Sequence, residues 1–146
     1  MEVNGIRMNP FVIFNQLTFG STQVANAAGV TSRQLRYWET QGYIEALPEK
    51  ANNARQYSVG NAIKVISIKQ GLDSGLKLAD AAKAAGDIID QTNYLGTLMG
   101  STYLGYQKAA DHVALQFGPL EGNSDGQLTG IIKQDRTYFK IREKRL

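Results

Sequence analysis

The pattern of apolar and polar positions becomes regular at residue 21. Ser21 is a favourable N-cap residue, and Val24 and Ala28 follow it at helical spacing. Gly29 stands where helices commonly end in a left-handed residue. These positions predict a two-turn helix that is capped by Ser21 and ends before Gly29.

A second helix is predicted directly after this glycine. Thr31 and Gln34 form a Thr-x-x-Gln capping box, in which each side chain satisfies a backbone amide at the start of the helix. The helix should run from about Ser32 to Gln41, and Gly42 should close it. Two short helices joined by a tight turn are typical of the helix-turn-helix motif, which helical hairpins without a DNA-binding function share.

A small hairpin and two more helices are predicted next. Residues 43–47 and 54–57 are suited to strands and are separated by turn-prone residues, so we expect a two-stranded wing. Ser58 should cap a longer apolar helix that ends before Gly75. An alanine-rich helix should follow over residues 78–85.

The remaining segments give weaker patterns. Residues 8–14 fit a short helix or a strand. A seam from Thr92 to Val113, with alternating steps of three and four, favours a coiled-coil helix, although internal glycines weaken it and an intramolecular helical layer fits equally well. Residues 118–126 have the composition of a loop. The tail, residues 128–142, fits a hairpin or a helix, and we favour a helix or a disordered end.

Together these patterns predict a mainly α protein, in which a winged helix-turn-helix head with a small two-stranded wing precedes a helical C-terminal region. We divide the chain into an N-terminal extension (1–20), the head (21–86), a helical dimerisation region (87–117), and a linker with a basic tail (118–146). A chain of this length can bury one modest core, with or without an appendage.

The composition narrows the possible functions. The chain has no cysteine and a single histidine, His112, which excludes a disulfide framework, a thiolate metal site and a histidine-rich metal site. Its N-terminus lacks the pattern of a signal peptide, and no apolar stretch is long enough to span a membrane. We therefore expect a cytoplasmic protein without a cofactor and without a membrane partner.

Charge is distributed unevenly, although the net charge is only +3. Residues 21–86 carry eight basic and five acidic side chains, whereas residues 87–132 carry one and five. The last fourteen residues carry six basic and two acidic side chains. A basic head is compatible with a phosphate-rich partner. The basic tail can reach DNA or an acidic partner, or it can be a solvated terminus.

The second predicted helix carries the best candidates for contact with nucleic acid. Two basic residues and one aromatic residue share a face at spacings of three and four residues: Arg33, Arg36 and Tyr37. Leu35 and Trp38 fall on another side, where they can anchor the helix. This arrangement suits a recognition helix in the major groove. The alternative is that the arginines form solvated ion pairs, for example with Glu39, and that the tyrosine is half-buried core.

A series of motifs runs through the head at regular distances: Gln23-Val24-Ala25, Ala28-Gly29-Val30-Thr31, Leu35-Arg36-Tyr37-Trp38-Glu39, Gln41-Gly42-Tyr43-Ile44, Asn53-Ala54-Arg55-Gln56-Tyr57-Ser58 and the stretch from Ile68 to Gly75. In order and spacing these motifs resemble the MerR family of bacterial transcription regulators. The small residues of the fourth helix and the glycines beyond it depart from the family pattern. The lack of cysteines is a third departure, and it rules out a thiolate-coordinated metal sensor.

The resemblance implies a set of contacts and partners. Groove and phosphate contacts would come from Thr31, Ser32, Arg33, Arg36 and Tyr37, and the wing would contact the DNA backbone through Asn53, Arg55 and Tyr57. The protein would then be a sequence-specific regulator that binds an inverted-repeat operator as a homodimer. Its partners would be double-stranded DNA, a second copy of itself and RNA polymerase.

Three other functions are compatible with the sequence to different degrees. A phage excisionase-like or architectural DNA-binding protein would use a similar winged head to coat direct repeats. A protein-interaction module would have lost DNA binding. An enzyme is poorly supported, because His112 stands alone and no nucleophile-elbow or phosphate-loop motif occurs. We expect no enzymatic activity.

Overall fold

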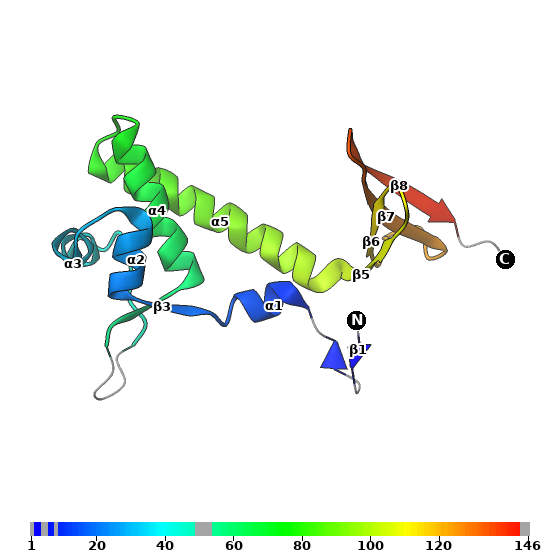
Figure 1. The fold of residues 1–146 in the computed structure, drawn as a ribbon, viewed down its shortest axis with the longest axis horizontal. Coiled ribbons are helices and arrows are strands. Elements are labelled where there is room, and N and C mark those ends of the chain that lie inside the picture. Colours follow the sequence, from blue (N-terminus) through cyan, green and yellow to red (C-terminus); the bar gives the residue numbers. More distant parts are fainter. Residues whose placement is uncertain (1, 4–5, 8, 49–53, 144–146) are drawn as a thin grey trace. The chain divides into compact units, whose positions relative to one another are not determined.

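The protein consists of two compact units (Figure 1). The structure is a computed structural model, and it describes residues 2–3, 6–7, 9–48 and 54–143. The head unit spans residues 11–95, and the sheet unit combines residues 1–10 with residues 96–146.

Seven elements follow one another from the N-terminal extension through the head unit: α1 (Pro10–Phe14), β3 (Thr18–Gly20), α2 (Ser21–Ala28), α3 (Ser32–Thr40), β4 (Gln56–Ser58), α4 (Val59–Asp73) and α5 (Leu78–Thr102). The described residues of the sheet unit form six strands: β1 (Glu2–Val3), β2 (Ile6–Arg7), β5 (Tyr103–Lys108), β6 (Val113–Phe117), β7 (Gly126–Ile132) and β8 (Thr137–Glu143). Helix α5 begins in the head unit and ends in the sheet unit.

The predicted helix-turn-helix is confirmed. Gly29 adopts φ 67° at the end of α2, and Val30 donates its amide to the carbonyl of Ala25. The capping box of α3 forms as expected: the Gln34 amide donates to Thr31 Oγ1 at 3.1 Å, and the Thr31 amide donates to Gln34 Oε1 at 2.8 Å. The predicted cap of α2 is wrong by one residue, because Gly20 is the N-cap and donates its amide to Gln23 Oε1.

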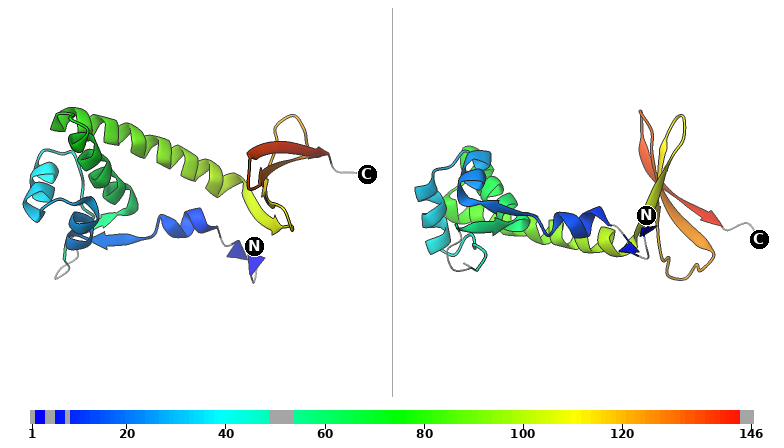
Figure 2. Two further views of the ribbon diagram at one scale, coloured as in Figure 1. Left: turned by 45° about the horizontal axis from the view of Figure 1, so that its top comes forward. Right: turned by 60° about the horizontal axis from the view of Figure 1, so that its bottom comes forward.

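One hydrophobic core holds the helices of the head unit together. Leu35 and Trp38 are buried on the inner side of α3, as their spacing predicted. They belong to a single cluster to which α2, α4 and the start of α5 also contribute: Val24, Ala25, Ala28, Val30, Leu35, Trp38, Ile44, Tyr57, Ala62, Val65, Ile68, Ala81, Ala82 and Ala85. The two views of Figure 2 show α4 lying beside the first half of α5.

The wing differs from the predicted hairpin. Residues 43–47 form no strand, and their tie to β4 is the Leu47 amide, which donates to the Gln56 carbonyl at 2.8 Å. Strand β4 instead pairs antiparallel with β3 of the N-terminal extension, with Phe19 opposite Tyr57. The prediction failed because strand composition is visible in a sequence, whereas a partner located almost forty residues upstream is not.

Helix α5 is longer than the predicted helix over residues 78–85. It has 25 residues and continues without a break past Gly96 and Gly100 to Thr102. Only the first half of the seam predicted from Thr92 to Val113 therefore lies on α5. Beyond Thr102 the chain is extended, and Gly105 adopts φ 142°, which no helix accommodates.

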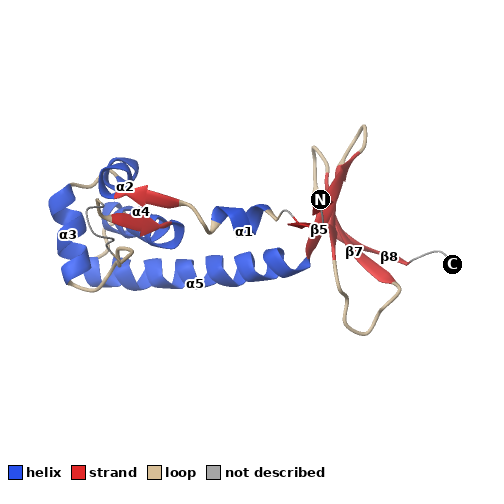
Figure 3. Ribbon diagram, turned by 90° about the horizontal axis from the view of Figure 1, so that it is seen from below, coloured by secondary structure: helices blue, strands red, loops and turns tan. Residues whose placement is uncertain are grey.

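The predicted fold class, mainly α with a helical C-terminal region, is wrong. Helices make up 48% of the structure and strands 23%, and the C-terminal half contains a four-stranded antiparallel sheet of order β5-β6-β7-β8 (Figure 3). The tail forms the hairpin β7–β8, with Leu128 opposite Ile141, so our preference for a helix or a disordered end was also wrong. The alternating apolar pattern of a tail rich in β-branched and aromatic residues agrees with this outcome.

One face of this sheet is apolar. Its register aligns Tyr106, Leu115, Gly130 and Phe139 in one row across the four strands. Gly130 leaves room for the ring of Phe139 to approach that of Phe117, and the two rings meet edge-on with centroids 6.0 Å apart. The sheet unit therefore has aromatic packing of its own.

Candidate nucleic-acid interface

The outer face of α3 exposes the side chains that the sequence singled out. Five predicted contact residues are exposed, among them Tyr37 at 53%: Thr31, Ser32, Arg33, Arg36 and Tyr37. Leu35 and Trp38 bury the opposite side of the same helix, which fixes how the exposed side is oriented. The tyrosine is therefore a surface residue and not the half-buried core residue of the alternative interpretation.

Arg55, which directly precedes β4 and is assigned here to the wing, is tied to α3 by an ion pair. Arg55 Nε lies 3.2 Å from Glu39 Oε1, and the Glu39 side chain is largely buried. The Arg55 carbonyl accepts a hydrogen bond from the Ser21 amide at 3.1 Å, which links the same residue to the start of α2. A single wing residue thus contacts both helices of the helix-turn-helix.

A hollow of about 360 Å³ lies where α3 meets the wing. It is lined by four residues: Arg36, Glu39, Thr40 and Arg55. Two guanidinium groups beside one carboxylate give it a net positive charge. Such a hollow offers planar donors that suit a phosphate oxygen.

Tyr57, which the sequence assigned to the wing contacts, lies in the core and is 1% exposed. Burial raises the pKa of its hydroxyl above the usual 10.0, and the Glu39 carboxylate raises it further, while Arg55 and Arg36 oppose this shift. The phenol therefore stays protonated at neutral pH. Tyr57 is opposite Phe19 of β3 in the strand pair, and Phe19 packs against the same core. Asn53 lies outside the described residues.

The sequence analysis did not assign two parts of this site. Residues 18–20 form the strand that holds β4, and Glu39 is the residue that joins wing and helix. The alternation of Leu17, Thr18 and Phe19 was a weak signal for the strand. Glu39 was considered as a partner for the arginines of its own helix, whereas its partner in the structure is on the wing.

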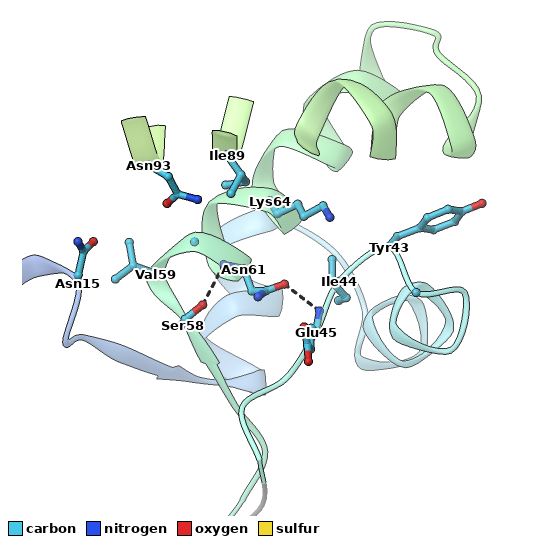
Figure 4. A pocket seen from close by; sticks show the side chains of 12 residues that line it. Asn15, Tyr43, Ile44, Glu45, Ser58, Val59, Asn61, Lys64, Ile89 and Asn93 are labelled. Atoms are coloured by element: carbon cyan, nitrogen blue, oxygen red, sulfur yellow. Dashed lines mark hydrogen bonds between the residues drawn. The ribbon is translucent and has the colours of Figure 1, made fainter. Parts of the chain in front are cut away.

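A second hollow, of about 400 Å³, is lined by residues that follow α3, by the start of α4 and by part of α5 (Figure 4). The Glu45 amide donates to Asn61 Oδ1 at 2.8 Å, and the Asn61 amide donates to Ser58 Oγ, so these side chains already have backbone partners. Asn15, Ile89 and Asn93 line its other wall. No group of three or more metal-binding side chains occurs within the described part of the chain.

Helices α2 and α3 form a helix-turn-helix, and β4 follows them in the chain. Residues 21–57 match the model of the MerR family regulatory protein. This segment is similar to a MerR-family domain. This match confirms the resemblance found in the sequence and suggests a DNA-binding transcription regulator.

The MerR match covers α2, α3 and most of β4, and it ends before α4, α5 and the sheet. A comparison with curated proteins found no match to this chain. None of the helices in the described ranges is both long and apolar enough to cross a lipid bilayer.

Proposed function

We propose that the chain is a sequence-specific regulator that binds an inverted-repeat DNA operator as a homodimer. The observation that carries the proposal is the exposed cationic face of α3, which the Glu39–Arg55 ion pair joins to the wing of a MerR-family head. RNA polymerase is the partner through which such a regulator would act.

In this proposal the first turn of α3 enters the major groove. Thr31, Ser32 and Arg33 then approach base edges and phosphates, because they lie at the exposed N-terminal end of the helix. Arg36 and Arg55 hold the DNA backbone at the hollow between helix and wing. Tyr37 contributes an aromatic edge beside them.

The homodimer accounts for the symmetry of the proposed operator. A single head presents one recognition helix and reads one half-site, so an inverted repeat requires two heads related by a twofold axis. Helix α5 supplies candidate contact residues, because Ile88 and Leu95 lie two turns apart on one face and are exposed.

Substitution of the two arginines tests the docking surface. Arg36→Ala and Arg55→Ala should each weaken binding to specific and random duplex alike, and each should lower the slope of log K against log salt by about one unit, as expected for one lost phosphate contact. Lys83→Ala, which removes an exposed cation from α5, should leave the slope unchanged. The measurement is fluorescence anisotropy over a salt series.

Unchanged affinity in folded Arg36→Ala and Arg55→Ala proteins would remove the proposed docking surface. If the protein instead coats adjacent direct repeats cooperatively and bends them, an excisionase-like role replaces that of an operator-binding regulator.

A further inference from the structure

The hollow of about 400 Å³ in the head unit is lined by one cationic and one anionic side chain, Lys64 and Glu45. We propose that it binds a free amino acid with a polar, uncharged side chain. Lys64 pairs with the carboxylate of this ligand, and Glu45 pairs with its ammonium group. The inference goes beyond the proposed function, because no part of it depends on DNA binding.

The two charged side chains come from different elements but approach the same place (Figure 4). The Glu45 amide donates to Asn61 Oδ1 at 2.8 Å, and Lys64 follows Asn61 by three residues on the same face of α4. Among the described residues, neither charged side chain takes part in an ion pair or a hydrogen bond. Both charges are therefore available to a ligand.

This pair of charges favours a ligand that carries both signs. A purely anionic ligand would lie against the Glu45 carboxylate, and a purely cationic ligand would lie against the Lys64 ammonium group. Like charges placed together lower affinity and thereby discriminate against such ligands. A zwitterion meets both groups with the opposite charge, and every free amino acid carries a carboxylate and an ammonium group on one carbon atom.

The other lining residues favour a polar side chain on the ligand. Asn15, Asn61 and Asn93 contribute carboxamide groups, which both donate and accept hydrogen bonds. Ile44 and Val59 also line the hollow, but they are only 3% and 6% exposed and offer little apolar surface. The volume lies within the range of roughly 300–1,000 Å³ that is typical of small-molecule sites, so an amino acid fits with accompanying water.

The test is isothermal titration calorimetry of the full-length protein with L-serine, L-asparagine and L-glutamine at neutral pH. We expect at least one of them to bind with a millimolar or lower dissociation constant. Its N-acetyl derivative lacks the ammonium group, and its methyl ester lacks the carboxylate. Each derivative should bind about tenfold more weakly than the parent amino acid, as expected for one lost contact between charged groups.

Two substitutions assign these contacts to residues. Lys64→Met keeps an unbranched side chain without the charge, so it should abolish the difference in affinity between the amino acid and its methyl ester. Glu45→Gln should abolish the difference between the amino acid and its N-acetyl derivative. Lys83→Met is the matched control, because it removes an exposed cation of α5 that is not among the residues lining the hollow, and it should leave all affinities unchanged.

Three results would overturn the inference. The first is that none of the three amino acids binds the wild-type protein at millimolar concentration. The second is a methyl ester or N-acetyl derivative that binds the wild-type protein as tightly as its parent. The third is binding that Lys64→Met and Glu45→Gln both leave unchanged, which would show that the ligand binds elsewhere. None of these measurements uses DNA, so their outcome is independent of the test of the docking surface.

Discussion

At the scale of single residues, close packing explains the small side chains at the start of α5. A Cβ atom added to Gly71 of α4 would lie 2.9 Å from the Cβ and 3.3 Å from the Cα of Ala81, which is fully buried. The two helices therefore approach too closely for larger side chains at this point. This contact accounts for the small side chain at Ala81.

Gly71→Ala should lower the free energy of unfolding by about 1–3 kcal/mol, because the backbone of α5 must move to admit the methyl group. Gly86→Ala is the matched control. It adds the same methyl group to a helical glycine with no neighbour within 4 Å, and it should raise stability by about 0.5–1 kcal/mol. Urea denaturation of both variants measures this. Equal effects in the two proteins would argue against close packing at Gly71.

Glu39 offers a test in which two effects have opposite signs. If it acts only as a negative charge near the DNA, Glu39→Gln should strengthen binding. We expect the variant to bind duplex several-fold more weakly, because the wing loses the carboxylate that holds Arg55 at 3.2 Å. Fluorescence anisotropy at fixed salt decides between the two signs. An affinity at or above that of the wild type would show that the ion pair does not position the wing.

At the scale of elements, an ion pair between Lys133 and Asp111 joins two loops of the sheet, the β5–β6 loop and the β7–β8 loop. Lys133 Nζ donates to Asp111 Oδ2 at 2.9 Å, and His112 Nδ1 lies 2.7 Å from Asp111 Oδ1. The hydrogen bond from Lys133, followed by that from His112, lowers the pKa of the Asp111 carboxyl well below its usual range. The β5–β6 loop is thereby connected to the β7–β8 loop.

The stability that Asp111 contributes should depend on pH. Because its pKa is lower in the folded protein, the contribution is present above the ordinary carboxyl pKa of about 3.9 and is lost as the pH falls below that value. Asp111→Asn should therefore be less stable than the wild type at neutral pH, and the difference should shrink in acid. Unfolding curves of both proteins at neutral pH and in acid measure this difference in stability. A difference that persists unchanged in acid would rule out the charge as its cause.

The elements that the sequence predicted are those that local contacts define. Thr31 and Gln34 lie three residues apart and cap α3 by themselves, so the boundary of that helix could be predicted from a short window. The sheet depends on pairings such as Tyr106 with Leu115 and on the conformation of Gly105, which a helical seam of apolar residues does not reveal. Where apolar and polar residues alternate imperfectly, the same sequence pattern fits both a helix and a strand.

At the scale of the whole molecule, one part of the candidate site could be predicted from the sequence and another part could not. The spacing of Arg33, Arg36 and Tyr37 was sufficient to predict a shared exposed face on α3. The support of the wing was not predictable, because it depends on β3 and on the contact between Glu39 and Arg55. Both are tertiary contacts between segments that the sequence analysis treated separately.

The most direct test of the account is selection of bound sequences by the full-length protein from a pool of random duplexes. We expect enrichment of an inverted repeat with two half-sites about one helical turn apart or a multiple of it, because each head reads one half-site. The same selection with Arg36→Ala should recover fewer bound molecules. Failure of the wild-type protein to enrich any sequence would contradict the claim that this chain is a sequence-specific DNA-binding regulator.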